Sequence, residues 1–102
     1  MTEEIKKLVD KTVEAIQDKK GRGITVIDLS GIDGCITKAF VICEGGSPSQ
    51  VDAISDNIEE KMIEKCRRKV LRTQGKENAF WVILDYGEVV VHIFQTPYRS
   101  FY

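Results

Sequence analysis

The segment that decides the fold is residues 80–94, which read FWVILDYGEVVVHIF. Both halves consist mostly of aromatic and β-branched residues, which favour extended backbone. Tyr86-Gly87 lies between them and supplies a turn. The segment therefore predicts a β-hairpin with strands at 80–85 and 88–94.

Cross-strand pairing divides the side chains of this hairpin between two faces. A two-residue turn pairs Asp85 with Glu88 and Trp81 with His92, because directly opposed residues share a face. One face is then wholly apolar and is expected to cover the helices; it consists of Phe80, Val82, Leu84, Val89, Val91 and Ile93. The opposite face combines aromatic, aliphatic and acidic side chains: Trp81, Ile83, Asp85, Glu88, Val90, His92 and Phe94.

The second face has two interpretations. A tryptophan inside a patch with a polar rim is typical of a protein-binding hot spot. Alternatively, another element, such as the terminal segment, covers Trp81 and Phe94. The hairpin by itself does not decide between these interpretations.

The remainder of the chain predicts two helices, further strands and a terminal helix. Apolar steps of three and four indicate an amphipathic first helix, and Ser47-Pro48-Ser49-Gln50 has the residues of a capping box with proline at the first helical position. The second strand is apolar at consecutive positions, which favours burial on both faces. The expected elements are a helix over 2–19 capped by Thr2, strands at 24–29 and 39–43, a helix from Ser47 to near Cys66, a short strand at 70–73, the hairpin, and a helix from Tyr98.

This order of elements predicts an α/β (α+β) fold. We expect a single mixed β-sheet of about five strands with helices packed on it, in one domain spanning 1–102. A chain of 102 residues has room for one compact domain and hardly a second. No apolar run approaches the roughly 18 residues needed to span a bilayer.

The charges argue against a dedicated nucleic-acid binder. The chain carries 15 Lys and Arg against 16 Asp and Glu, with a formal net charge of −1. Residues 61–78 are nevertheless basic. The stretch from Lys61 to Arg72 is interpreted as a solvated helix end, where cations suit the macrodipole, and the alternative is a patch that touches RNA phosphates.

The cysteines and the single histidine do not form a recognisable catalytic or metal site. Cys35, Cys43 and Cys66 are an odd number without a Cys-x-x-Cys pair, which indicates a reduced, cytoplasmic protein with ordinary thiols and no metal. The acidic, amphipathic N-terminus is not a secretory signal. General-base catalysis by His92 would need an orienting partner, and Glu88 is four positions away along the strand, so a structural role is favoured.

The Gly45-Gly46-Ser47 turn invites a phosphate-binding interpretation, because it precedes a helix N-terminus. The lysine of a P-loop is missing. A nucleotidyltransferase would carry an acidic pair for two metal ions about ten residues further on. Residues 57–61 read NIEEK, inside the helical stripe, so catalysis by this route is not expected. A residual nucleotide-binding or nucleotidyl-transfer enzyme remains the alternative function.

Residues 81–94 resemble the hairpin motif of the ribosomal silencing factor family, also called iojap-like proteins. The resemblance extends over nearly the whole chain. Further matching positions, in family order, are 26–29, Phe40-Val41-Ile42, the Gly-Gly-Ser turn with Gln50-Val51, Gly75, Arg99 and Phe101-Tyr102. The hairpin motif is highly specific, and the turn much less so.

The resemblance implies a non-enzymatic translation regulator without a cofactor. Such a protein binds ribosomal protein L-fourteen on the large ribosomal subunit, sterically prevents the small subunit from joining, and lowers translation when nutrients are scarce. The implied fold has a nucleotidyltransferase-like topology without the catalytic metal site. The implied partner-binding residues are Trp81, Asp85, Tyr86 and His92, with Glu88 and the aromatics near the terminus as weaker candidates. Their carboxylates suit a basic, RNA-adjacent partner. Peripheral contact with ribosomal RNA and a monomeric or homodimeric state both remain open.

The chain also departs from the family pattern. Lys38-Ala39 stands where the family often has an acidic residue and a tyrosine, and Gly46 replaces a common threonine. Relatives usually continue beyond the position of Tyr102 with an acidic tail. The C-terminal tail of the family is therefore expected to be missing, and its contacts cannot be assigned.

Overall fold

A computed structural model of the chain describes residues 1–96 and 98–101. The order of its elements agrees with the order predicted for the helices and strands. The elements are α1 (Glu3–Asp18), β1 (Arg22–Asp28), β2 (Ala39–Gly45), α2 (Pro48–Cys66), β3 (Arg72–Gln74), β4 (Trp81–Asp85), β5 (Val89–Gln95) and the 3₁₀ helix η1 (Tyr98–Phe101). Pro97, expected to stop the last strand, and Tyr102 lie outside the described residues.

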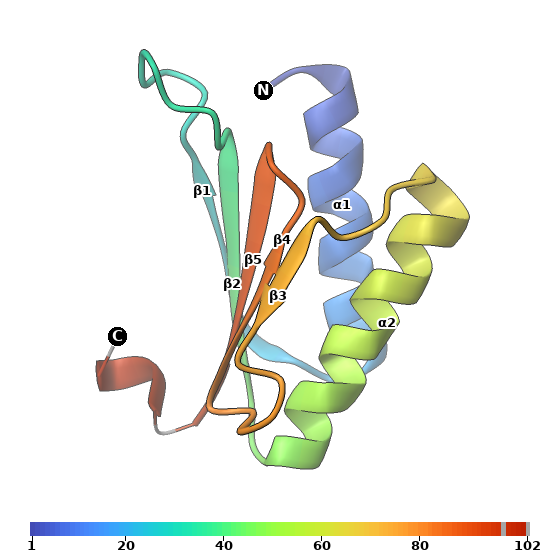
Figure 1. The fold of residues 1–102 in the computed structure, drawn as a ribbon, viewed down its shortest axis with the longest axis vertical. Coiled ribbons are helices and arrows are strands. Elements are labelled where there is room, and N and C mark those ends of the chain that lie inside the picture. Colours follow the sequence, from blue (N-terminus) through green and yellow to red (C-terminus); the bar gives the residue numbers. More distant parts are fainter. Residues whose placement is uncertain (97, 102) are drawn as a thin grey trace.

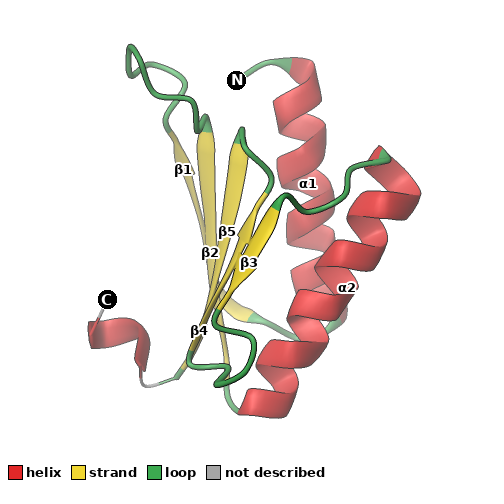
Figure 2. Cartoon of the chain, viewed as in Figure 1, coloured by secondary structure: helices red, strands yellow, loops and turns green. Residues whose placement is uncertain are grey.

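Two helices pack on one mixed sheet of five strands. The strand order is β1-β2-β5-β4-β3. Strands β2 and β5 run parallel, whereas the other neighbours run antiparallel. Figure 1 shows α1 and α2 on one side of the sheet and η1 on the other, and Figure 2 shows the two layers by type. The predicted α/β (α+β) class with a five-stranded mixed sheet is confirmed, and the helices leave one face of the sheet uncovered.

Side-chain caps define where both helices begin. The Thr2 hydroxyl accepts from the amide of Ile5, and the Ser47 hydroxyl accepts from the amide of Gln50. The expected reciprocal capping box is not completed, because the Gln50 side chain turns elsewhere. Its oxygen accepts from the Gly46 amide at 2.7 Å, and its NH₂ group donates to the carbonyls of residues 19 and 20. Gln50 therefore joins the start of α2 to the end of α1.

The hydrophobic core lies between the helices and the covered face of the sheet. Val82, Leu84, Val89, Val91 and Ile93 are all fully buried there, as the hairpin predicts. Phe80 is the exception. It precedes β4, is 43% exposed, and stacks on Tyr98 of η1 with the ring centroids 4.5 Å apart.

The hairpin register differs from the predicted one by two residues. Asp85 pairs with Val90 and Trp81 with Phe94, and the Tyr86 amide donates to the Val89 carbonyl. The bond between Tyr86 and Val89 leaves Gly87 and Glu88 as the two turn residues. Gly87 adopts a positive φ of 87°, which glycine tolerates without strain. A shift of two keeps every strand residue on its predicted face, whereas a shift of one would exchange the faces.

Strand β2 is buried on one face only, which corrects the prediction that it is buried on both. Its residues alternate between fully buried and half-exposed positions. Ala39, Val41 and Cys43 enter the core, whereas Phe40 and Ile42 lie on the uncovered face. Both helices lie on the same side of the sheet, so nothing in the helical layer covers the second face.

Candidate functional site: an aromatic face on the uncovered side of the sheet

The uncovered face of the sheet carries a shallow hollow of about 270 Å³ over β2, β5 and β4. Strand pairing explains its composition. In register, Ile42 lies beside His92 and Trp81 beside Phe94. We call five of the lining side chains the aromatic face: Phe40, Ile42, Trp81, His92 and Phe94. Arg99 of η1 forms the remaining wall.

Rings on neighbouring strands stack to form this face. The Trp81 indole lies nearly parallel to the Phe94 ring, with centroids 5.2 Å apart, and to the His92 ring at 5.9 Å. Phe40 meets His92 edge to face at 5.1 Å. Such pairs add to the stability that burial alone supplies. The rings therefore pack against one another and form a continuous, largely apolar surface.

A hydrogen bond fixes the orientation of the indole. Trp81 Nε1 donates to His92 Nδ1 at 3.1 Å. Because an indole N–H can only donate, Nδ1 must carry a lone pair, and the imidazole is neutral with its proton on Nε2. Burial lowers the pKa of His92 from its ordinary value of 6.5. This contact gives the sole histidine the structural role that the sequence favours.

Arg99 of η1 borders the hollow, and within it Trp81 is partly exposed whereas Phe94 is only 5% exposed. Arg99 of η1 donates to the Glu44 carboxylate at 3.1 Å and to the Thr25 hydroxyl at 3.2 Å. A hydrogen bond from Thr96 and the Arg99 guanidinium together lower the pKa of Glu44. The structure therefore leaves the Trp81 indole partly accessible and covers Phe94, so neither interpretation of this face holds for both rings.

Asp85 lies at the end of β4, on the same face as Trp81. One carboxylate oxygen accepts from the Gly87 amide at 2.8 Å, and the other lies 3.5 Å from the Arg72 guanidinium. The aspartate therefore stabilises the hairpin turn, and part of its charge is balanced by a neighbouring cation. It still presents a partly exposed carboxylate at the rim of the face.

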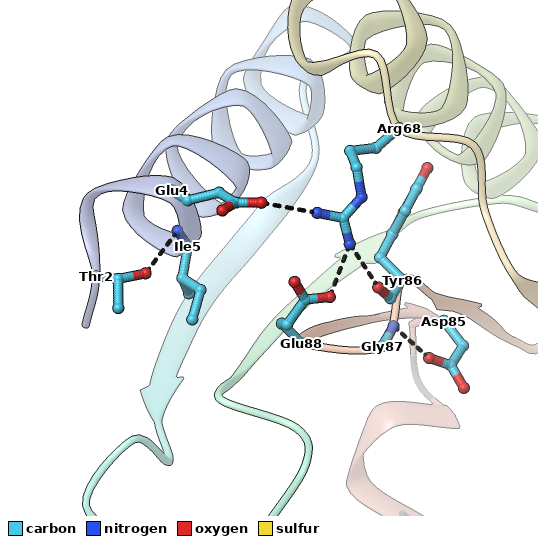
Figure 3. Close-up of polar contacts among 8 residues, drawn as sticks. All are labelled: Thr2, Glu4, Ile5, Arg68, Asp85, Tyr86, Gly87 and Glu88. Atoms are coloured by element: carbon cyan, nitrogen blue, oxygen red, sulfur yellow. Dashed lines mark hydrogen bonds and ion pairs between the residues drawn. The ribbon is translucent and has the colours of Figure 1, made fainter.

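The structure places neither Glu88 nor the Tyr86 side chain on this face, which corrects their expected placement. Figure 3 shows Arg68 joined to Glu88, to the Tyr86 carbonyl and to Glu4. Glu88 is in the turn, and Arg68 donates to its carboxylate at 2.7 Å and to the Tyr86 carbonyl at 3.0 Å. The same guanidinium lies 3.3 Å from Glu4 of α1. Through Arg68, the hairpin turn is joined to both helices, and the hydrogen bond lowers the pKa of Glu88.

The Tyr86 side chain enters the core and is fully buried. Its hydroxyl has no hydrogen-bond partner among the described residues, and burial raises its pKa. Alternation along β4 contains the signal for this placement, because Tyr86 continues the series of Val82 and Leu84. By contrast, no local signal distinguishes the exposed positions of β2, Phe40 and Ile42, from its buried ones.

The described residues offer little for catalysis. No group of three or more His, Cys, Asp or Glu side chains within them could hold a metal ion. Cys43 is buried, which raises the pKa of its thiol to about 12 and keeps it unreactive. In the Gly45-Gly46-Ser47 turn, the Gly46 amide and the Ser47 hydroxyl already bond within the protein, to Gln50. Neither described helix is long and apolar enough to cross a membrane.

Much of the basic stretch is engaged in ion pairs. Lys61 contacts Asp18 at 2.8 Å, which raises the pKa of Lys61 and lowers that of Asp18, and Arg68 binds Glu88. Exposed side chains at the end of α2 are left as the cationic surface: Lys65, Arg67 and Lys69. This arrangement fits the interpretation as a solvated helix end.

Comparison with known proteins gives a consistent result across nearly the whole chain. The family model described as "Ribosomal silencing factor during starvation" matches residues 2–102. A protein of Halalkalibacterium halodurans named Ribosomal silencing factor RsfS is 36% identical over 95 residues, covering 93% of this chain and 80% of the relative. The Bacillus subtilis protein of the same name is 35% identical over 97 residues, covering 95% of this chain and 80% of the relative.

The fold has a counterpart among solved structures. A crystal structure of a Bacillus halodurans protein superposes with a TM-score of 0.83 at 33% identity. The match covers 95% of this chain and 89% of that one. The layered arrangement that leaves the aromatic face uncovered therefore lies within a fold already seen by crystallography.

Proposed function

Because the chain belongs to the ribosomal silencing factor family, we propose that its aromatic face binds ribosomal protein L-fourteen on the large ribosomal subunit. The bound protein then blocks the approach of the small subunit and represses translation when nutrients are limiting. It acts in the cytoplasm by occlusion, without turnover and without a cofactor. The family supports a ribosome-associated role in silencing translation. The observation that carries the docking surface is the partly exposed, hydrogen-bonded Trp81 on the face of the sheet that the helices leave uncovered.

The composition of the aromatic face suits an interface. Trp is among the residues that contribute most to binding energy when they lie at the centre of a contact. A standard interface buries about 800 Å² on each partner. The face spans three adjacent strands and is bordered by charged side chains, with Asp85 at one end and Glu44 with Arg99 at the other. This is the pattern of an apolar centre with a polar rim.

Only one of the two carboxylates expected on the aromatic face lies there in the structure. Asp85 remains on the face as a partly exposed carboxylate, but Glu88 is in the hairpin turn and bound to Arg68. We therefore assign the affinity mainly to aromatic burial, and we assign to Asp85 a role in orienting a basic partner. Tyr86 contributes from beneath, by packing the end of β4 against the core.

The exposed cations at the end of α2 lie in the helical layer, whereas the aromatic face lies on the other side of the sheet. If they touch ribosomal RNA, the contact is peripheral to the protein-directed one. Binding to large subunits would then weaken as salt increases, with a shallow slope that reflects a few phosphate contacts.

The docking proposal is tested by pull-down with isolated large subunits. Replacing Trp81 by alanine should raise Kd about 30-fold, corresponding to at least about 2 kcal/mol for an interface anchor. The matched control is Ile63→Ala, which truncates a 53% exposed apolar side chain in the helical layer. Equal binding by Trp81→Ala and wild type, with both variants folded by circular dichroism, would reject the aromatic face as the docking surface.

The occlusion mechanism needs a separate measurement. Light scattering follows the joining of small and large subunits as the protein is added. We expect joining to decrease with the wild type and with Ile63→Ala, and to recover with Trp81→Ala. Undiminished joining in the presence of excess, demonstrably bound wild-type protein would refute occlusion while leaving the docking surface intact.

A further inference from the structure

We propose that His92 is a positioning residue: its neutral imidazole holds the Trp81 indole in the orientation that docks, and protonation of the ring releases it. This inference rests on the proposed function, because it concerns the regulation of the same face. The proposal predicts that docking weakens as the pH falls and His92 takes up a proton. In this proposal His92 affects binding by orienting Trp81, and not by contacting the partner itself.

The geometry makes the bond specific for one protonation state. Trp81 Nε1 is 3.1 Å from His92 Nδ1, and the indole nitrogen has a hydrogen to give but no lone pair to offer. In the imidazolium form Nδ1 also carries a hydrogen, so two donors would face each other and the bond cannot exist. The two residues are diagonal neighbours on β4 and β5, since Ile83 is the direct partner of His92. The indole therefore lies across the strand direction, over the hollow.

The surroundings offer the imidazolium little compensation. From β2, His92 is faced by Phe40 and Ile42, and the nearest carboxylate on that strand is Glu44, which is bound to Arg99. From β4 the acidic group on the same face is Asp85, which is paired with Arg72. Both carboxylates sit diagonally to His92, at about 7–8 Å between Cα atoms. Arg99 of η1 lines the same hollow and would repel a second positive charge.

The direction of the pH dependence follows from burial. The pKa of His92 lies below its ordinary value of 6.5 because the buried ring disfavours charge. In the unfolded chain the group takes up a proton as the pH falls through 6.5, whereas in the folded chain it does so only at lower pH. The folded state therefore loses stability below pH 6.5, and the loss levels off once the folded form is also protonated.

The first experiment uses the free protein and needs no partner. Trp81 is the only tryptophan in the chain and His92 the only histidine, so indole fluorescence reports this contact directly. We expect intensity and emission maximum to change in a single transition below pH 6.5. His92→Asn places an amide oxygen near the position of Nδ1, which keeps an acceptor but removes the titration. The transition should be absent in that variant. A flat wild-type profile, or the same transition in His92→Asn, would overturn the proposal.

The second experiment measures binding to large subunits at pH 7.5 and at successively lower pH, over the range in which the fluorescence of the free protein changes. At pH 7.5, His92→Leu should bind about fivefold more weakly than wild type, as expected for the loss of one hydrogen bond of about 1 kcal/mol. At pH 7.5, His92→Asn should bind more tightly than His92→Leu, and its binding should not weaken further in acid, whereas binding by the wild type should weaken over that range. Full binding by a folded His92→Leu variant, or equal acid weakening in His92→Asn, would overturn the positioning role.

The two experiments separate this inference from the function it builds on. If the wild type fails to bind large subunits at pH 7.5, the proposed docking fails. The fluorescence profile of the free protein still decides whether His92 holds Trp81. If the wild type binds but the fluorescence does not respond to pH, docking stands and the positioning role is wrong.

Discussion

Gly75 is a position where a single added methyl group would displace the backbone of Trp81, the first residue of β4. It lies between β3 and β4 with a φ of +82°, and its carbonyl accepts from the Ala79 amide at 2.9 Å. A Cβ added there would lie 2.0 Å from the carbonyl oxygen of Trp81. Real Cβ atoms do not approach a backbone oxygen so closely, so the first residue of β4 would have to move.

The expected cost of Gly75→Ala has two parts. A non-glycine residue in the left-handed region costs roughly 1–2 kcal/mol. Displacing the Trp81 carbonyl, and with it the end of the ladder to Phe94, should bring the total to about 3 kcal/mol, within the range of strained backbone sites. A domain of this size is stable by about 10 kcal/mol, so the variant should still fold, with the urea midpoint lowered by about 1–3 M.

Gly34→Ala is the matched control. Gly34 also has a positive φ, +77°, but an added Cβ would meet nothing within 4 Å. The control should therefore show the backbone cost without the steric one. Urea unfolding followed by circular dichroism measures both variants. If Gly75→Ala loses no more stability than Gly34→Ala, the close approach of Gly75 to the Trp81 carbonyl does not constrain this turn and the reasoning fails.

Two further predictions concern the residues beneath the hairpin. Tyr86→Phe removes a buried hydroxyl that has no partner among the described residues. The free energy of unfolding, measured by urea titration, should therefore rise by about 1 kcal/mol. A loss of stability would show that the hydroxyl is bonded. Arg68→Met should lower the free energy of unfolding by about 1–2 kcal/mol at pH 7, because the Tyr86 carbonyl and the Glu88 carboxylate lose their donor. The control Lys65→Met, at an exposed site in the last turn of α2, should change the free energy of unfolding little. The Glu88 pKa is held below its ordinary 4.5 by Arg68, so the difference between wild type and Arg68→Met should shrink as the pH falls below that value; a difference that stays constant in acid would exclude the ion pair as its cause.

The sequence contained the elements and their faces, because these depend on local periodicity. Alternation in β4 and β5 identified the buried valines and leucine and left Trp81 on the opposite face, and a register error of two residues did not change that result. Helix caps at Thr2 and Ser47 were equally readable, since the cap bonds form within three residues of chain. Tyr86 was expected in the turn, and only the structure shows that it continues the alternation of β4 into the core.

What only the tertiary structure decided is which elements become neighbours. The apolar run of β2 is compatible with burial on both faces, and it lines the aromatic face only because both helices pack on one side and β2 pairs with β5. The Trp81–His92 bond requires a diagonal contact that a different register would break. Arg68 reaches Glu4 and Glu88, which lie 64 and 20 residues away along the chain. Such contacts depend on the summed packing of the whole sheet and both helices, and no local pattern encodes them.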